Sequence, residues 1–130
     1  MFCLDRAVYL FYFVDNKDAK MGKGEYLGEF EQIVLLAVLR LGKNAYGVTI
    51  LEEIEQRTGR SVMIGAVYAT LDRLEIKRYI SSRVGSPTPE RGGRAKRFFR
   101  VTAQGSAALE RSREILQNMW AGLDPVLEEP

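Results

Sequence analysis

The sequence predicts a mainly α-helical fold of the α+β class, with one β-hairpin placed between helices. Two observations support this prediction. Apolar residues recur every three or four positions in several separate stretches, as they do on the buried face of a helix. Late in the chain, two short segments instead alternate polar and apolar residues, which is the pattern of a half-buried strand. The length of 130 residues suits a single domain with its own core.

The first two helices are predicted over residues 28–41 and 47–58, where the apolar residues have helical spacing. In the first of them, Leu36 and Leu39 widen the apolar stripe. We therefore expect this helix to be buried on more than one side. The segment SVMI (61–64) that follows the second helix has the β-branched content of a brief strand.

The third helix is predicted over residues 65–77. Its buried face is marked by Val67, Leu71 and Leu74, and its opposite face presents Ala66, Tyr68, Ala69, Thr70, Asp72 and Arg73. The alternating segments YISSRV (79–84) and KRFFRV (96–101) then predict a hairpin around a Gly- and Pro-rich loop. Three helices followed by such a hairpin form a winged helix-turn-helix, and a helix-turn-helix places its recognition helix in the major groove of DNA.

A last helix is predicted from an N-cap at Thr102 to about Leu123. Leucines at 109, 116 and 123 fall seven residues apart, with further apolar residues between them, which is the a/d pattern of a helix that packs on another helix. The stripe can pack on its own domain, but so small a domain leaves little core to cover. We therefore place six residues at a homodimer interface: Leu109, Ile115, Leu116, Met119, Trp120 and Leu123.

Positive charge is concentrated in the middle of the chain. Residues 57–100 hold eleven Lys and Arg against three Asp and Glu, a net charge of +8, whereas the segments 1–56 and 101–130 each have a net charge of −3. Clustered cations neutralise phosphates, so this distribution favours a nucleic-acid partner. A solvated basic surface without such a partner is the alternative.

Composition excludes most catalytic and metal sites. The chain has no histidine and one cysteine, Cys3, so it can form neither an internal disulfide, nor a Cys/His zinc site, nor a His-based catalytic dyad or triad. The acidic residues of the second helix (Glu52, Glu53 and Glu55) have the spacing of a solvated face. We therefore expect no enzyme activity, no catalytic residue, no metal site and no cofactor.

The N-terminus carries an apolar run, AVYLFYFV (7–14), that is too short to span a bilayer and lacks the features of a signal peptide. It reads as a strand, a docked helix or translated upstream sequence, with Met21 as an alternative start. The predicted organisation is an N-terminal extension (1–20), a winged-helix DNA-binding domain (21–101) and a C-terminal dimerisation helix and tail (102–130). We expect a cytoplasmic protein without a membrane partner.

Three segments, in this order, resemble the PadR-type transcriptional regulators. They are LGEFEQIVLLAVLRLGKNAYGVTILEEIEQRTG (27–59), GAVYATLDRLE (65–75) and RAKRFFRVTAQG (94–105). The resemblance implies a DNA-binding repressor that dimerises through C-terminal helices and binds a palindromic operator, and some members bind small-molecule effectors. The sequence departs from the family where Ala66, Ala69 and Arg78 replace its usual Thr, Pro and Gly.

The predicted DNA contacts combine the exposed face of the third helix with the wing. They are Ala66, Tyr68, Thr70, Arg73, Arg91, Arg94, Lys96 and Arg97. Phe99 is expected to pack inward rather than to stack on bases. The leading function is therefore a homodimeric, sequence-specific regulator of transcription on double-stranded DNA. The alternative is a winged-helix module that binds protein or RNA, and an effector site near Phe30, Met119 and Trp120 is a further expectation.

Overall fold

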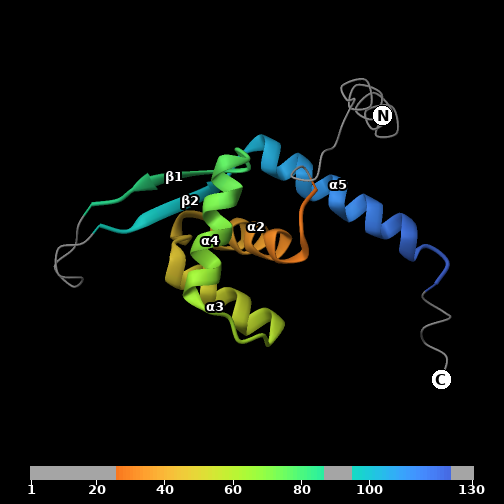
Figure 1. Cartoon of the computed structure of the whole chain (residues 1–130), viewed down its shortest axis with the longest axis horizontal. Coiled ribbons are helices and arrows are strands. Elements are labelled where there is room, and N and C mark those ends of the chain that lie inside the picture. The colour runs from red at the N-terminus through yellow and green to blue at the C-terminus, as the bar shows by residue number, and fades with distance from the viewer. Residues whose placement is uncertain (1–25, 87–94, 124–130) are drawn as a thin grey trace.

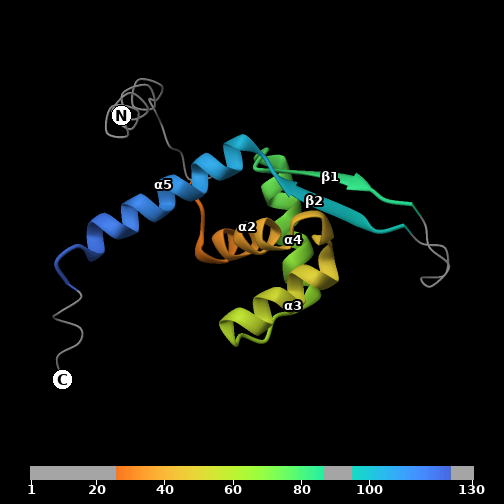
Figure 2. The same ribbon diagram turned by 180° about the vertical axis from the view of Figure 1, so that it is seen from behind.

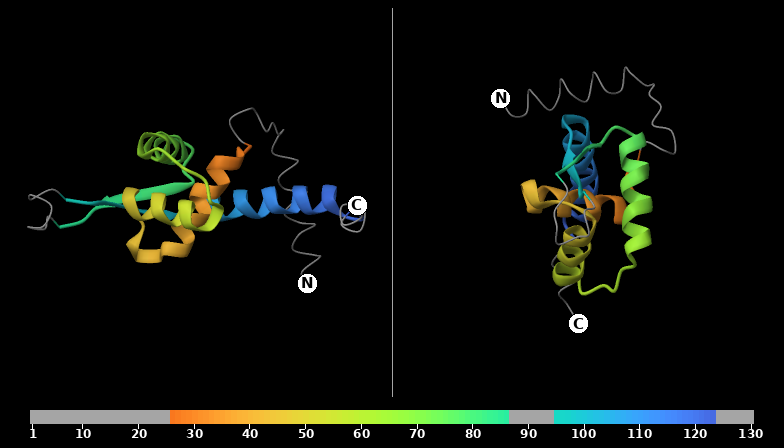
Figure 3. Two further views of the ribbon diagram at one scale, coloured as in Figure 1. Left: turned by 90° about the horizontal axis from the view of Figure 1, so that it is seen from below. Right: turned by 90° about the vertical axis from the view of Figure 1, so that its left-hand side faces the viewer.

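The computed structural model describes residues 26–86 and 95–123. In chain order its elements are α2 (Glu29–Leu41), the short 3-10 helix η2 (Gly42–Asn44), α3 (Gly47–Thr58), α4 (Ile64–Ile76), β1 (Ile80–Val84), β2 (Arg97–Val101) and α5 (Ala103–Trp120). Helices α2, α3 and α4 pack together, and the hairpin and α5 extend from them in opposite directions (Figures 1, 2 and 3). The predicted winged-helix fold with a C-terminal helix is confirmed. The N-terminal extension 1–20, the wing tip with Arg91 and Arg94, and the C-terminal tail lie outside the described residues.

The core lies between the three packed helices and the inner face of the hairpin. Its largest fully buried side chains belong to α2 (Val34, Leu35, Val38), α3 (Ile50, Ile54), α4 (Val67, Leu71, Leu74) and β1 (Ile80). Phe99 of β2 is 3% exposed, so it packs inward as predicted. Burying side chains of this size stabilises a fold by about 1.5–3 kcal/mol each before the cost of chain entropy.

The sheet gains its third extended segment from a different part of the chain than the sequence predicts. The backbone N–H of Phe99 donates to the carbonyl oxygen of Ala45 at 2.9 Å, and Tyr46 forms an isolated bridge with Phe98. The predicted strand at 61–64 is therefore wrong. The backbone N–H of Val62 donates to the Glu55 carboxylate at 3.0 Å instead of joining a strand ladder, and residue 64 already begins α4.

Helix α2 is buried on one side only, contrary to the prediction. Leu36 and Leu39 are 48% and 50% exposed, because α3, α4 and the hairpin cover the face that carries Val34 and Leu35. The widened stripe of this helix thus leaves apolar side chains at the surface of the isolated chain.

Helix α5 begins where the sequence predicts and ends three residues earlier. The Thr102 hydroxyl accepts a hydrogen bond from the backbone N–H of Gly105 at 3.0 Å, as an N-cap does, and the last helical residue is Trp120. Gly105 and Ala108 are buried against the domain, whereas every residue from Ile115 to Trp120 is exposed. Within the described residues, no helix has the length and apolar character needed to cross a membrane.

Candidate nucleic-acid interface

Helix α4 has one buried and one exposed face. Val67, Thr70, Leu71 and Leu74 are each at most 2% exposed. The exposed side carries Gly65, Ala66, Tyr68, Ala69, Asp72, Arg73 and Ile76. The prediction that Thr70 lies on the exposed face is wrong, because Thr70 is placed between Val67 and Leu74 on the helix and so points into the core with them. Its hydroxyl accepts a hydrogen bond from Arg73 Nη2 at 3.1 Å.

Tyr68 lies at the edge of this exposed face, against the start of α3. Its side chain is 42% exposed. A Cβ atom on Gly47 would lie 2.9 Å from the ring atom Cε1, so the glycine makes room for the phenol. The phenol is therefore next to the first turn of α3, where unpaired backbone N–H groups favour anions.

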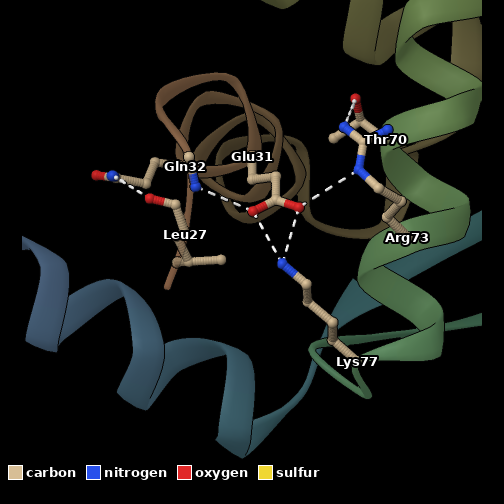
Figure 4. A network of polar contacts seen from close by, with 7 residues as sticks. Leu27, Glu31, Gln32, Thr70, Arg73 and Lys77 are labelled. Atoms are coloured by element: carbon tan, nitrogen blue, oxygen red, sulfur yellow. Dashed lines mark hydrogen bonds and ion pairs between the residues drawn. The ribbon is translucent and has the colours of Figure 1, made fainter. Parts of the chain in front are cut away.

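Arg73 forms an ion pair with a buried carboxylate, although its own side chain remains 55% exposed. Glu31 of α2 is 7% exposed, and its Oε2 lies 3.5 Å from Arg73 Nε and 3.0 Å from Lys77 Nζ (Figure 4). Its Oε1 accepts from the backbone N–H of Gly28 at 3.0 Å. Burial alone raises the pKa of Glu31, but the Gly28 hydrogen bond and the Lys77 and Arg73 cations outweigh it, so the pKa lies below its usual value. The carboxylate is therefore ionised at neutral pH.

Arg97 joins the hairpin to α4. Its guanidinium pairs with Glu75 and lies 3.9 Å from Asp72, and its Nε donates to the Ser82 hydroxyl at 3.2 Å. The same guanidinium lies 5.1 Å from the centre of the Phe99 ring. These contacts fix the side chain of Arg97 on the protein, whereas Lys96 lies over the ring of Tyr46 with Nζ 4.4 Å from its centre.

Four exposed cations form no ion pair in the part of the chain that the structure describes: Lys43, Arg78, Arg83 and Arg100. The sequence reasoning did not include Lys43, Arg78 or Arg83 in the predicted interface, but it expected Arg100 on the wing strand to reach phosphates. It also missed Met63, which is 75% exposed at the start of α4, because it assigned residues 61–64 to a strand.

Comparison with known proteins settles the family. The model of the transcriptional regulator PadR-like family matches residues 35–111. A relative from Lysinibacillus sphaericus, described as uncharacterized protein X, is 32% identical over 103 residues, which cover 78% of this chain and 86% of the relative. The chain belongs to the PadR-like family of transcriptional regulators. Its family therefore consists of transcription regulators rather than enzymes.

Two solved structures share the fold of this PadR-like chain. A PadR family transcription regulator from Clostridium difficile R20291 superposes with a TM-score of 0.60 at 20% identity, covering 75% of this chain and 98% of that one. A PadR-like regulator from Bacillus cereus ATCC 14579 gives a TM-score of 0.63 at 17% identity, covering 86% and 100%. At these identities the likeness extends to the fold alone.

The C-terminal helix of this PadR-like regulator presents an apolar stripe. Ile115, Leu116, Met119, Trp120 and Leu123 are 46–71% exposed. Leu109 differs from them, because it is partly buried against the core of its own domain. Helix α5 extends away from the hairpin (Figure 1), so this stripe lies on the side of the molecule away from the wing.

Two cavities lie away from the predicted effector residues. The larger, about 770 Å³, lies between the end of α2 and the hairpin, and its lining includes Leu39, Lys43, Arg83, Phe98 and Arg100. The smaller, about 170 Å³, lies between α2 and α3 and is lined by residues such as Leu36 and Glu53. Neither is lined by Phe30, Met119 or Trp120, so the effector site at those residues stays a prediction.

Proposed function

We propose that this PadR-like protein is a sequence-specific regulator that binds double-stranded DNA with α4 in the major groove. The observation that supports this most is the two-sided character of α4. Four of its residues anchor it in the core, while its other face is free of any covering element in the described residues. The net charge of +8 over residues 57–100 supplies the electrostatic attraction that such binding requires.

The exposed side chains divide by chemistry. Met63, Ala66 and Ala69 are apolar and suit contacts with the methyl groups of thymine, which are accessible in the major groove. Tyr68, beside the first turn of α3, suits a phosphate or a base edge. Arg91, Arg94 and Lys96 of the wing suit the phosphate backbone, which determines affinity rather than sequence choice. Arg73 and Arg97 are weaker candidates, because carboxylates of the protein already hold them.

Assembly as a homodimer is part of the proposal. In the described part of the chain, the apolar stripe of α5 is 46–71% exposed from Ile115 onward, and its burial against a second copy would remove large apolar side chains from water. A dimer with two-fold symmetry presents two recognition helices to a palindromic site. Repression of the bound promoter, in the cytoplasm, is the role that the family resemblance favours.

The DNA-binding proposal is tested by selecting an operator from a pool of random duplexes with the wild-type protein. Tyr68→Ala should then weaken binding to the operator by about tenfold or more and binding to a scrambled duplex much less, since one good polar contact contributes about 1–3 kcal/mol. Failure to enrich any sequence from the pool would contradict specific DNA recognition. Enrichment of an RNA from a parallel RNA pool would favour the interaction-module alternative.

The dimer is tested with Leu116→Glu, which places a charge in the apolar stripe of α5. The matched control is Gln117→Glu, which adds the same charge one residue away, outside the stripe. Light scattering should show monomers for Leu116→Glu and dimers for the control, with a loss of operator affinity as bivalency disappears. A dimer that survives Leu116→Glu at low concentration would place the interface elsewhere.

A further inference from the structure

The buried carboxylate of Glu31 faces the basic end of the recognition helix. Arg73 is the sole cation within α4, and Lys77 is the residue that directly follows the helix. Both reach the same carboxylate on α2, Lys77 with Nζ 3.1 Å and 3.0 Å from the two oxygens (Figure 4). The positive charge that α4 could offer to DNA is therefore already paired with a carboxylate of the protein.

Arg73 would reach the DNA side if this contact were absent. It lies four residues after Ala69 and seven after Ala66, so the three side chains share one flank of the helix. Its side chain is still 55% exposed while it contacts Glu31 and Thr70. A rotation of this long side chain about its own bonds would turn the guanidinium from the carboxylate toward the exposed face of α4, the face that the proposed DNA complex uses.

Glu31 is well placed to prevent that rotation. Its side chain is 9% exposed, and the backbone N–H of Gly28 and the Lys77 ammonium hold both of its oxygens. A carboxylate fixed in this way costs little to reorganise and attracts a nearby cation more strongly than a solvated one does. Thr70 Oγ1 accepts a hydrogen bond from Arg73 Nη2, so the guanidinium has a second contact that keeps it on the protein.

We infer that Glu31 is a specificity-determining positioning residue, which withholds Arg73 from DNA phosphates and so lowers affinity for non-operator DNA more than for the operator. The reason is that non-specific binding rests almost entirely on phosphate neutralisation, whereas specific binding adds contacts to base edges. A cation that stays on the protein weakens the first kind of binding and leaves the second intact. This inference rests on the proposed DNA-binding function.

The test is a salt titration of binding by the full chain to the selected operator and to a scrambled duplex of equal length. Glu31→Gln should bind the scrambled duplex several-fold more tightly than wild type. Its plot of log affinity against log salt should be steeper by about 0.9 for each phosphate newly contacted. The ratio of operator to scrambled affinity should fall. In the double variant Glu31→Gln with Arg73→Gln, the slope should return to the wild-type value.

The control for net charge is Glu110→Gln, which likewise removes the carboxylate partner of an arginine, but on the exposed part of α5. It should leave both the slope and the affinity ratio unchanged. Arg73→Gln alone provides a test that leaves the buried carboxylate intact. Because Arg73 contacts no phosphate in the wild type, its slope should match the wild-type slope on both duplexes.

Three results would overturn the inference. The first is an unchanged or shallower salt slope for a folded Glu31→Gln protein, and the second is a steep slope that persists in the double variant. The third is a salt slope that is lower by about 0.9 per protomer for Arg73→Gln alone. Circular dichroism during heating reports whether each variant is folded. If Glu31→Gln does not fold, the slope of Arg73→Gln decides. A wild type that binds neither duplex would instead reject the proposed function itself, which separates the two failures.

Discussion

Gly105→Ala is the substitution for which the structure gives the clearest expectation. Gly105 lies in the first turn of α5, directly against the segment that leads into β1. A Cβ atom there would lie 2.9 Å from Val101 Cγ1 and 3.0 Å from the carbonyl carbon of Tyr79, and it would press on the Tyr79 carbonyl oxygen as well. Ordinary contacts between carbon atoms are about 3.5–4.0 Å, so the helix would have to move by about 0.5–1 Å.

That movement would disturb two hydrogen bonds that fix the start of α5. The Tyr79 carbonyl accepts from the backbone N–H of Thr102 at 3.0 Å, and the Thr102 hydroxyl accepts from Gly105 at 3.0 Å. Overpacking of this kind costs about 1–3 kcal/mol, and the higher helix propensity of alanine returns at most about 1 kcal/mol. We expect a net loss of about 1–2 kcal/mol of unfolding free energy, or roughly 4–16 °C in Tm for a domain of this size.

The matched control is Gly65→Ala, the same change in the first turns of α4. No atom outside its immediate surroundings lies within 4 Å of a Cβ placed there, so the substitution should raise stability by about 0.5–1 kcal/mol. Thermal and urea unfolding of the two variants measure the contrast. A Gly105→Ala protein as stable as wild type would refute the close approach of α5 to Tyr79, and with it the angle at which α5 leaves the domain.

Three further predictions follow from single features. Arg78 has a φ of 68°, in the left-handed region, so Arg78→Gly should raise stability by up to about 1 kcal/mol in urea unfolding, and a loss would contradict the backbone there. The pKa of Glu31 lies below its usual value of 4.5, so the folded chain binds fewer protons than the unfolded chain, and stability should fall as the pH drops below about 4.5. In the Glu31→Gln variant, the Tm should therefore decrease less over this acidic range than the Tm of wild type. An equal decrease in both proteins would show that other carboxylates cause the acid sensitivity. A chain that starts at Met21 should keep the Tm and operator affinity of the full chain, and a large drop in either would show that residues 1–20 belong to the fold.

Several of the basic side chains near the candidate interface form ion pairs with carboxylates of the protein itself. Glu31 holds Arg73 and Lys77, and Glu75 holds Arg97, so several basic side chains of the helix and hairpin have internal partners. The exposed cations without a carboxylate partner in the described residues, such as Arg78 and Arg100, remain available for an external anion, whereas the guanidinium of Arg83 lies 4.8 Å from the centre of the Phe98 ring. The count of basic residues therefore overstates the number of phosphate contacts, and the salt slope should be correspondingly modest.

The sequence by itself determined the four main helices, the hairpin and their order. The helical spacing of apolar residues predicted the bounds of α2, α3 and α4 to within one residue at each end, and Thr102 as an N-cap predicted the start of α5. Alternation identified the hairpin and placed Phe99 in the core. These properties are local, because they depend on the spacing of apolar residues and on the nearest backbone groups. The family resemblance rested on the same segments.

Tertiary structure decided which side chains face the candidate interface. Thr70 has a hydroxyl that could contact DNA, but it lies on the buried face of α4. Arg73 has the positive charge of a DNA contact, but it pairs with Glu31, 42 residues earlier in the chain. The third extended segment of the sheet came from Ala45 and Tyr46 rather than from residues 61–64, because Glu55 occupies the backbone donor of Val62. Each of these outcomes depends on a contact with a residue outside the segment itself, and the periodicity of a single segment contains no information about such a contact.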